Sequence, residues 1–183
     1  MKVKKVLGDE RRELILKWLR SKNEPLTGTE LATRTNVSRQ VIVQDISLLK
    51  ARGEPIIATS QGYMYIHDKR PSQKQIERLI ACKHAPEQTR EELYLIVDHG
   101  VTVKDVIIEH PVYGDLTASI MVSNRKEVDE FLKKIEETKA SYLSELTDGV
   151  HLHTLVANTK EDLDEVCQAL KQTGLLIQEE VID

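Results

Sequence analysis

The sequence predicts an α+β protein made of two modules, and three observations support this. First, residues 1–71 carry 14 Lys and Arg against 8 Asp and Glu, whereas residues 72–183 carry 12 against 22. Second, helical apolar spacing in the first part is followed by two short β-rich runs. Third, the rest alternates strand-like and helix-like segments. A polar stretch with a proline at 67–72 marks the boundary, so we expect modules at 1–70 and 71–183.

The composition indicates an ordinary cytoplasmic protein. Of the 183 residues, 40% are hydrophobic and 31% charged. No apolar run reaches membrane-spanning length, and no secretory signal opens the chain, so no membrane partner is expected. Cys82 and Cys167 lie far apart and form no motif. We interpret them as reduced and buried, and a disulfide as the less favoured alternative.

The first module begins with three predicted helices. Residues 9–21 are predicted to form a helix, because Leu14, Ile15, Trp18 and Leu19 are spaced to lie on one apolar face. Asp9 is the candidate cap of this helix. Thr27 has Glu30 at capping-box spacing and is expected to begin a short second helix. After a tight turn, Ser38 is expected to cap a third helix that runs to about residue 52. A short helix, a turn and a longer helix are typical of a helix-turn-helix.

The third helix has two distinct faces. Ile42, Ile46 and Leu49 are spaced to pack inward. Arg and Gln outside that face can read guanine and adenine edges in the major groove, and a valine can contact a thymine methyl. A lysine near the end of the helix suits a phosphate contact. The candidate DNA-binding residues are therefore Ser38, Arg39, Gln40, Val43, Gln44 and Lys50.

Two β-rich runs, 55–59 and 63–66, flank a glycine-containing turn and predict a hairpin. A hairpin directly after a recognition helix is the wing of a winged helix-turn-helix. The alternative is a three-helix protein-interaction domain, but the basic balance favours binding to double-stranded DNA. The module resembles the winged helix-turn-helix of bacterial effector-responsive regulators, through residues 29–32, 36–40 and 45–50.

The second module is expected to be an α/β sandwich of ferredoxin-like or HPr-like type, with helices mainly on one side of a sheet. A short helix is the alternative interpretation of its first predicted strand, residues 76–83. No phosphate loop or nucleophile motif is present. The predicted strands are 76–83, 101–109, 116–122, 150–157 and 175–182. The predicted helices are 86–98, one capped by Ser123 or Asn124 that runs to about 138, and one capped by Asn158 or Thr159 that runs to 171.

A histidine pair in this module suggests a metal site. On a strand, His151 and His153 would point to one face. The pair alone could equally be the solvated polar face of a strand. Together with His84 and Glu92 it has the imidazole and carboxylate chemistry of a divalent transition-metal site. His84 precedes Pro86, so the loop must fold back for this. The alternative carboxylates are Glu87, Glu91 and Asp98.

Two further histidines have less specific surroundings. His99 precedes a glycine at the predicted end of a helix, where a cation suits the dipole, and we do not expect it to be a ligand. His110 begins a turn that contains Tyr113. These two residues are candidates for contact with an effector, although a structural turn histidine is the favoured reading of His110.

The segments His84-Ala85-Pro86, Glu91-Glu92-Leu93, 105–114 and 146–154 resemble the three-histidine domain of the niacin-responsive repressors, the NiaR type. That resemblance covers nearly the whole chain. It implies a homodimeric repressor of genes for NAD biosynthesis or niacin uptake, with nicotinic acid as corepressor. It also implies that His84, Glu92, His151 and His153 hold a divalent metal.

The resulting hypothesis is a non-enzymatic regulator. Nicotinate would fill an open coordination position and favour a dimer that fits operator DNA. One alternative is a regulator that responds to the metal itself. Another is a metal-dependent hydrolase fused to a DNA-binding module, with Glu87 or Glu91 as base. The ligand set does not distinguish nickel, zinc and iron.

Overall fold

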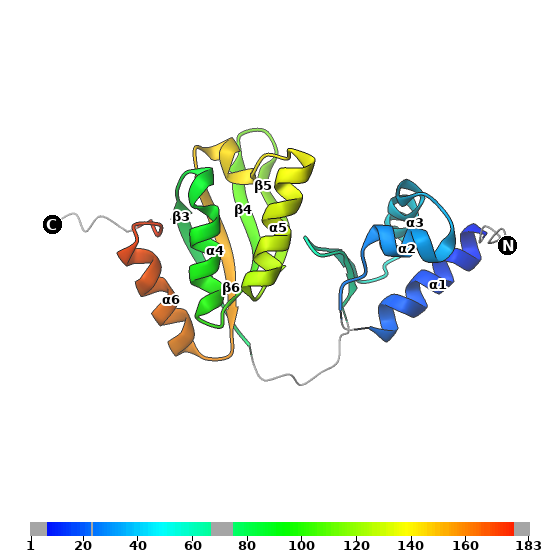
Figure 1. The fold of residues 1–183 in the computed structure, drawn as a ribbon, viewed down its shortest axis with the longest axis horizontal. Coiled ribbons are helices and arrows are strands. Elements are labelled where there is room, and N and C mark those ends of the chain that lie inside the picture. The colour runs from blue at the N-terminus through cyan, green and yellow to red at the C-terminus, as the bar shows by residue number, and fades with distance from the viewer. Residues whose placement is uncertain (1–6, 23, 67–74, 178–183) are drawn as a thin grey trace. The chain divides into compact units, whose positions relative to one another are not determined.

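The computed structural model describes residues 7–22, 24–66 and 75–177. The chain divides into two compact units, Met1–Arg70 and Pro71–Asp183 (Figure 1). Each unit has its own hydrophobic core. The predicted linker, with His67, falls outside the described residues.

The N-terminal unit contains a trihelical core and a two-stranded antiparallel sheet. Leu26 lies between the first two helices and exchanges two backbone hydrogen bonds of 2.9 Å with Tyr63, so a third short segment joins the hairpin. This arrangement is the predicted helix-turn-helix with a wing. Its elements are α1 (Gly8–Ser21), α2 (Gly28–Thr35), α3 (Arg39–Ala51), β1 (Ile56–Ala58) and β2 (Tyr63–Tyr65).

Two of the three helix caps predicted for this unit are confirmed. The Thr27 hydroxyl accepts a hydrogen bond from the backbone of Glu30 at 3.1 Å, and that of Ser38 accepts one from Val41 at 3.4 Å. The prediction for Asp9 is wrong, because α1 begins one residue earlier and Leu7 stands at its cap without a side-chain bond. The Asp9 carboxylate instead accepts a hydrogen bond from Arg12.

The recognition helix is fixed to α1 by apolar packing and by a buried charge. Ile42, Ile46 and Leu49 are buried, as their spacing predicted. Asp45 lies on α3 and is only 2% exposed. It accepts hydrogen bonds from the guanidinium groups of Arg11 and Arg12. Buried charges are costly unless they are paired, so this network holds α3 in one position against α1.

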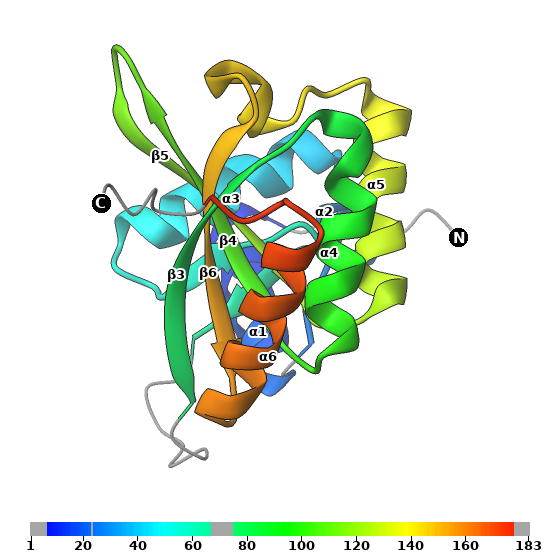
Figure 2. The same ribbon diagram turned by 90° about the vertical axis from the view of Figure 1, so that its left-hand side faces the viewer.

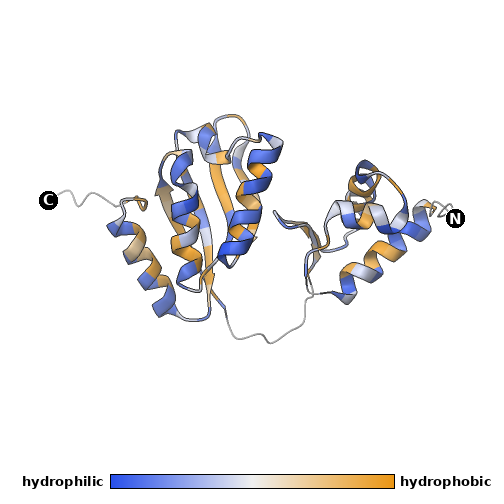
Figure 3. Ribbon diagram, viewed as in Figure 1, coloured by the Kyte–Doolittle hydropathy of each residue, from blue (hydrophilic) through white to orange (hydrophobic). Residues whose placement is uncertain are grey.

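The C-terminal unit is a four-stranded antiparallel sheet in the order β3-β6-β4-β5. Three helices cover one face of it (Figures 1 and 2). Hydrophobic residues follow the strands and the helix sides turned toward them (Figure 3). The elements are β3 (Ile76–Lys83), the 3₁₀ helix η1 (Pro86–Gln88), α4 (Thr89–Asp98), β4 (Thr102–His110), β5 (Gly114–Val122), α5 (Arg125–Thr138), the 3₁₀ helix η2 (Leu143–Thr147), β6 (Val150–Ala157) and α6 (Lys160–Gln172).

The predicted α+β class is confirmed, and the strand order selects one of its two variants. The first strand of the unit lies at an edge and the last named strand lies beside it. This is the HPr-like arrangement, whereas the first and third strands are central in a ferredoxin-like sheet. β3 is a strand, and the alternative of a short helix is wrong.

The last predicted strand, 175–182, is described only to residue 177. Leu176 forms an antiparallel bridge with Cys82 at the outer edge of β3, and the backbone of Ile177 donates to Ala81 at 2.9 Å. Within the described residues, no helix is both long and apolar enough to cross a bilayer.

Candidate metal centre and nucleic-acid interface

Strand β6 carries His151 and His153 toward the helices. Both are almost completely buried, with 3% and 2% of their surface exposed. Leu152 between them faces the other side of the sheet and is half-buried. The predicted shared face of the pair is therefore confirmed, and the alternative of a solvated polar face is wrong.

His84 and Glu92 reach the same place from a different part of the chain. His84 follows the end of β3, and η1 then turns the chain into α4. Glu92 lies in the first turn of α4, closer to the helix start than the sequence suggested, because the segment from Pro86 to Gln88 is a separate 3₁₀ helix. The loop folds back, so that His84 Nε2 lies 2.7 Å from Glu92 Oε2.

All three imidazoles converge on this carboxylate through their Nε2 atoms. The other two distances are 3.3 Å from His151 to Glu92 Oε1 and 3.4 Å from His153 to Glu92 Oε2. Ligand atoms about 2.0–2.1 Å from a divalent ion are separated by roughly 2.9–3.4 Å for octahedral to tetrahedral angles. Two of the three distances to the carboxylate fall in that range, and the third, 2.7 Å, is that of a short hydrogen bond; the four side chains are here called the three-histidine site.

In each histidine the other ring nitrogen, Nδ1, is engaged in a hydrogen bond, which leaves Nε2 as the atom that could bind a metal ion. The Nδ1 atoms of His84, His151 and His153 lie 2.9, 2.9 and 2.6 Å from the backbone oxygens of Ala85, Gly149 and Asp105. A carbonyl oxygen only accepts, so each Nδ1 carries a proton, and an Nε2 that gives up its own proton to a metal would present its lone pair to the ion. Metal-binding histidines are commonly oriented in this way.

A bulge in β4 frees one of these carbonyl groups. Between Val103 and Ile107, the register against β6 shifts by one residue. Asp105 lies in this bulge, where its backbone oxygen accepts a hydrogen bond from His153 Nδ1. Its carboxylate also accepts a hydrogen bond from the backbone of Thr154 at 3.0 Å. Asp105 therefore holds both the His153 ring and the backbone of the next residue, Thr154.

Gly149 allows the His84 loop to approach the start of β6. Its φ is +87°, and a Cβ at this position would lie only 2.3 Å from the backbone oxygen of His84. Any other residue would therefore combine backbone strain with a clash. The glycine sets how closely His84 lies to His151.

Glu92 and the imidazoles stabilise each other's charged forms. Burial raises the pKa of Glu92, but the charge and hydrogen bonds of the imidazoles outweigh it and hold that pKa well below its usual range. Burial lowers the pKa of His84 and His153, but the hydrogen bond and charge of Glu92 outweigh it and raise both. A buried carboxylate that attracts protonated imidazoles would also attract a cation.

Sequence reasoning missed Cys82 as a member of this neighbourhood. Cys82 is fully buried and pairs directly across from His151 in the sheet. Burial, followed by the charge of Glu92, raises the pKa of its thiol. Its position two residues before His84 was the available signal, since both would share one face of a strand.

Other sequence candidates lie outside the three-histidine site. Glu87 and Glu91 are exposed. Asp98 is also exposed and pairs with Arg125 at the surface. As expected, His99 stands at the end of α4, where its ring nitrogen lies 2.7 Å from the Leu95 carbonyl oxygen. Of the carboxylate alternatives to Glu92, Glu91 still acts on the site from the surface, because its charge contributes to the raised pKa of His84.

The two effector candidates lie at the tip of the β4–β5 hairpin. His110 Nδ1 accepts hydrogen bonds from the backbones of Val112 and Tyr113 at 3.1 and 3.3 Å, which fixes the turn. His110 is five residues along β4 from Asp105, or about 17 Å. Within one copy of the unit, the structure does not bring His110 and Tyr113 to the three-histidine site.

A surface depression of about 670 Å³ borders the three-histidine site at His84. This volume lies within the range of small-molecule sites. Lys83 contributes a cation to its wall, and the acidic groups come from η2 and the following turn. Its lining residues are Lys83, His84, Ala85, Pro86, Glu145, Asp148 and Gly149.

The recognition helix exposes the residues that the sequence proposed for DNA. Five of them are exposed, and Val43 is half-buried beside the apolar face. Ser38 also caps the helix, so its hydroxyl contributes to folding as well. The Arg39 side chain lies along the start of α2, since a Cβ on Gly28 would come within 3.5 Å of it.

The fold and the site together define a class: a winged helix-turn-helix protein with a C-terminal domain in which three histidines surround a buried carboxylate. Comparison with known proteins agrees with this class. Residues 11–64 match the HTH domain family, and residues 77–179 match the 3H domain family.

Two similar proteins are transcription repressors by name. Transcription repressor NadR of Bacillus subtilis (strain 168) is 62% identical over 175 residues, which cover 96% of this chain and 97% of the relative. Probable transcription repressor NiaR of Thermotoga maritima is 42% identical over 175 residues, covering 96% and 98%. This chain belongs to the NiaR/NadR family of transcription repressors, as its sequence motifs predicted.

Proposed function

We propose that this protein represses genes of NAD biosynthesis or niacin uptake, with nicotinic acid as corepressor and a divalent metal in the three-histidine site. The observation that carries the proposal is the convergence of three Nε2 atoms on one buried carboxylate, in a chain whose relatives are repressors. The choice of nicotinic acid rests on the resemblance of the motifs. We propose that the protein acts in the cytoplasm, as a regulator and not as an enzyme.

The metal would be held by His84, Glu92, His151 and His153. Their donor set, three imidazole nitrogens and a carboxylate oxygen, suits nickel, zinc or iron(II). The bound ion would supply a Lewis-acidic position for a ligand nitrogen or oxygen. Backbone carbonyl groups that accept a hydrogen bond from each Nδ1 hold the imidazoles in the orientation that metal binding requires.

Nicotinate would approach through the depression at His84. The molecule has a carboxylate and a pyridine nitrogen, and either suits an open coordination position. Lys83 in the wall offers a cation for the other end if the nitrogen faces the site. Contacts from His110 and Tyr113 stay a separate prediction. Replacing Tyr113 by Ala tests it, because nicotinate affinity should fall only if the hairpin tip reaches the ligand.

The DNA partner would be a palindromic operator read by a homodimer. Ser38, Arg39, Gln40, Val43 and Gln44 would face the major groove, with Lys50 at a phosphate. Two recognition helices must then lie about 34 Å apart, one helical turn of DNA. Nicotinate needs to prefer that dimer by only about 1–3 kcal/mol to act as a switch.

The test begins by selecting operator duplexes from a random pool with the full chain, zinc or nickel, and nicotinate. Gel-shift titrations on the selected duplex then compare protein with and without nicotinate and after chelation. We expect nicotinate to tighten binding roughly 5–150-fold, in a metal-dependent way. Operator affinity that neither nicotinate nor chelator changes would contradict the mechanism.

Variants separate sensing from DNA contact. The double substitution His151→Ala and His153→Ala should abolish the response to nicotinate and leave nonspecific DNA binding intact. His99→Ala is the matched control, since this histidine lies outside the three-histidine site. If the control loses the response equally, the effect does not come from the metal ligands.

Two alternatives use the same residues. In a metal-responsive regulator, operator affinity would follow metal concentration with nicotinate absent. In a hydrolase, a base would have to face the ion. The exposed side chains of Glu87 and Glu91 give no support to such a base. Turnover assays with the metal-loaded protein test the hydrolase directly.

A further inference from the structure

Cys82 stands beside the four proposed metal ligands and has no part in the proposed function. Its side chain is fully buried on β3. In the sheet it is the direct partner of His151, and it precedes His84 by two residues. Two of the four proposed ligands are thus its near neighbours, one across the strands and one along the chain.

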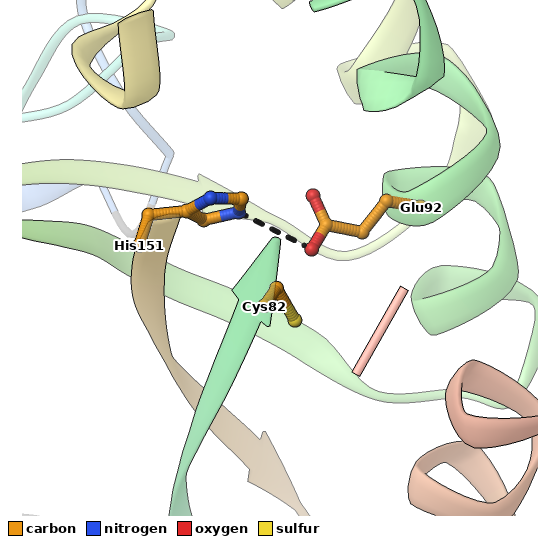
Figure 4. A group of neighbouring side chains, drawn as sticks. All are labelled: Cys82, Glu92 and His151. Atoms are coloured by element: carbon orange, nitrogen blue, oxygen red, sulfur yellow. Dashed lines mark hydrogen bonds and ion pairs between the residues drawn. The ribbon is translucent and has the colours of Figure 1, made fainter. Parts of the chain in front are cut away.

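The thiol lies close to two of the proposed ligands, Glu92 and His151. One ligand atom each from Cys82, Glu92 and His151 lie within 4.8 Å of one another (Figure 4). Binding to one ion would require a sulfur–nitrogen or sulfur–oxygen separation of about 3.1–3.6 Å. The 4.8 Å limit exceeds that separation by about 1.2–1.7 Å, so a shift of at most that size would bring the sulfur to a shared ion.

The charge balance of the site favours a second anionic ligand. A divalent ion with one carboxylate leaves a net positive charge among side chains that are 1–3% exposed. Isolated buried charge is costly, and a thiolate would make the site neutral. Binding a thiol releases its proton to the solvent, with no change in the oxidation state of sulfur or metal.

We infer that Cys82 is a thiolate ligand of the ion in the three-histidine site when no effector is bound. The inference rests on the proposed metal site. The donor set becomes three nitrogens, one oxygen and one sulfur, which favours zinc, cobalt(II), nickel or iron(II) over magnesium and manganese, because the latter prefer oxygen ligands.

Cobalt(II) provides a test that separates this inference from the metal site itself. The full-length, metal-free and reduced protein is titrated with Co²⁺ under inert gas, without nicotinate. Visible ligand-field bands report that the ion is bound in the site. An intense near-ultraviolet band from thiolate-to-cobalt charge transfer reports the sulfur ligand. We expect both to saturate together at one ion per chain.

The variants are Cys82→Ser and Cys82→Ala, with Cys167→Ala as the matched control. Cys167 is the other cysteine of the chain and is half-buried, with its sulfur 3.6 Å from Arg78. The Cys82 variants should lose the charge-transfer band, keep ligand-field bands and bind Co²⁺ about 10–100-fold more weakly. The control should keep both bands and its affinity.

The outcomes have distinct meanings. Wild-type ligand-field bands without the charge-transfer band would overturn the thiolate ligand and leave the metal site standing. A charge-transfer band that survives in both Cys82 variants would also overturn it. Absence of any cobalt spectrum would instead contradict the metal site of the proposed function. Circular dichroism confirms that each variant is folded, and the conservative serine variant keeps the volume of the side chain.

Discussion

Glu92→Gln is the most direct perturbation of the three-histidine site, because it removes one charge and almost no volume. Glu92 is 1% exposed and meets three imidazoles at 2.7, 3.3 and 3.4 Å. Glutamine keeps an oxygen in the same place but not the anion. We expect metal affinity to fall about 100–1,000-fold, which corresponds to roughly 2.8–4.2 kcal/mol.

Thermal unfolding makes this loss measurable without DNA or effector. At a free metal concentration of about 100 times the wild-type dissociation constant, binding stabilises the folded protein by roughly 2.7 kcal/mol. For a unit of this size, each kcal/mol raises Tm by about 3–6 °C, so the expected increase is on the order of 10 °C. In Glu92→Gln at the same metal concentration, the stabilisation is at most about 0.4 kcal/mol, or about 2 °C.

The assay follows circular dichroism during heating, with and without zinc, in wild type and variant. Glu91→Gln is the control, since its side chain is an exposed neighbour on the same helix. An equal metal-dependent rise of Tm in wild type and Glu92→Gln would refute the reasoning. So would the loss of that rise in the control.

Four further predictions concern pH, loop geometry, DNA and folding. The raised pKa values of His84 and His153 stabilise the metal-free protein at low pH and lose this contribution as pH rises above about 6.5, whereas the lowered pKa of Glu92 loses its contribution as pH falls below about 4.5. The site therefore stabilises the metal-free protein most between about pH 4.5 and 6.5. Because a metal ion competes with the protons on the imidazoles, the rise of Tm that zinc produces should increase from about pH 5.5 to about pH 7.5, as measured by calorimetry. Gly149→Ala should displace His84 and weaken metal binding about 10-fold or more, and zinc titration that shows unchanged affinity would contradict the close approach. Arg39→Ala should cost about 1–3 kcal/mol on operator DNA but little on random DNA, whereas Lys50→Ala should weaken both and reduce the salt dependence by about one ion. Asp45→Ala should destabilise the N-terminal unit by about 3 kcal/mol in urea unfolding, because its arginine partner stays buried, while Asp9→Ala, at the surface, serves as the control with a small effect.

Local features of the sequence were sufficient for most of the fold. The caps at Thr27 and Ser38 follow from hydrogen bonds within four residues of the chain. The shared face of His151 and His153 follows from the two-residue period of a strand. Asp9 shows the limit of such reasoning, because its carboxylate could serve either the helix start or Arg12, and it forms the ion pair.

Contacts between residues that are distant in the sequence could be predicted only in part. The motif resemblance named His84 and Glu92, but nothing local indicates that the loop before Pro86 folds back to within 2.7 Å. The carbonyl group of Asp105 became available through a bulge, which depends on the register of two strands distant in sequence. The strand order that separates the two sandwich variants is likewise a property of the assembled sheet.

The sequence by itself determined the winged helix-turn-helix and the shared face of the histidine pair, because periodicity, capping and charge act over a few residues, whereas the family and the set of four candidate ligands followed from the resemblance of its motifs. Only the tertiary structure decided that three Nε2 atoms meet one carboxylate, and that Cys82 pairs across the sheet from His151. Those contacts depend on how β3, β6 and α4 pack, and packing joins residues about sixty positions apart, as the separation of 59 between His151 and Glu92 shows.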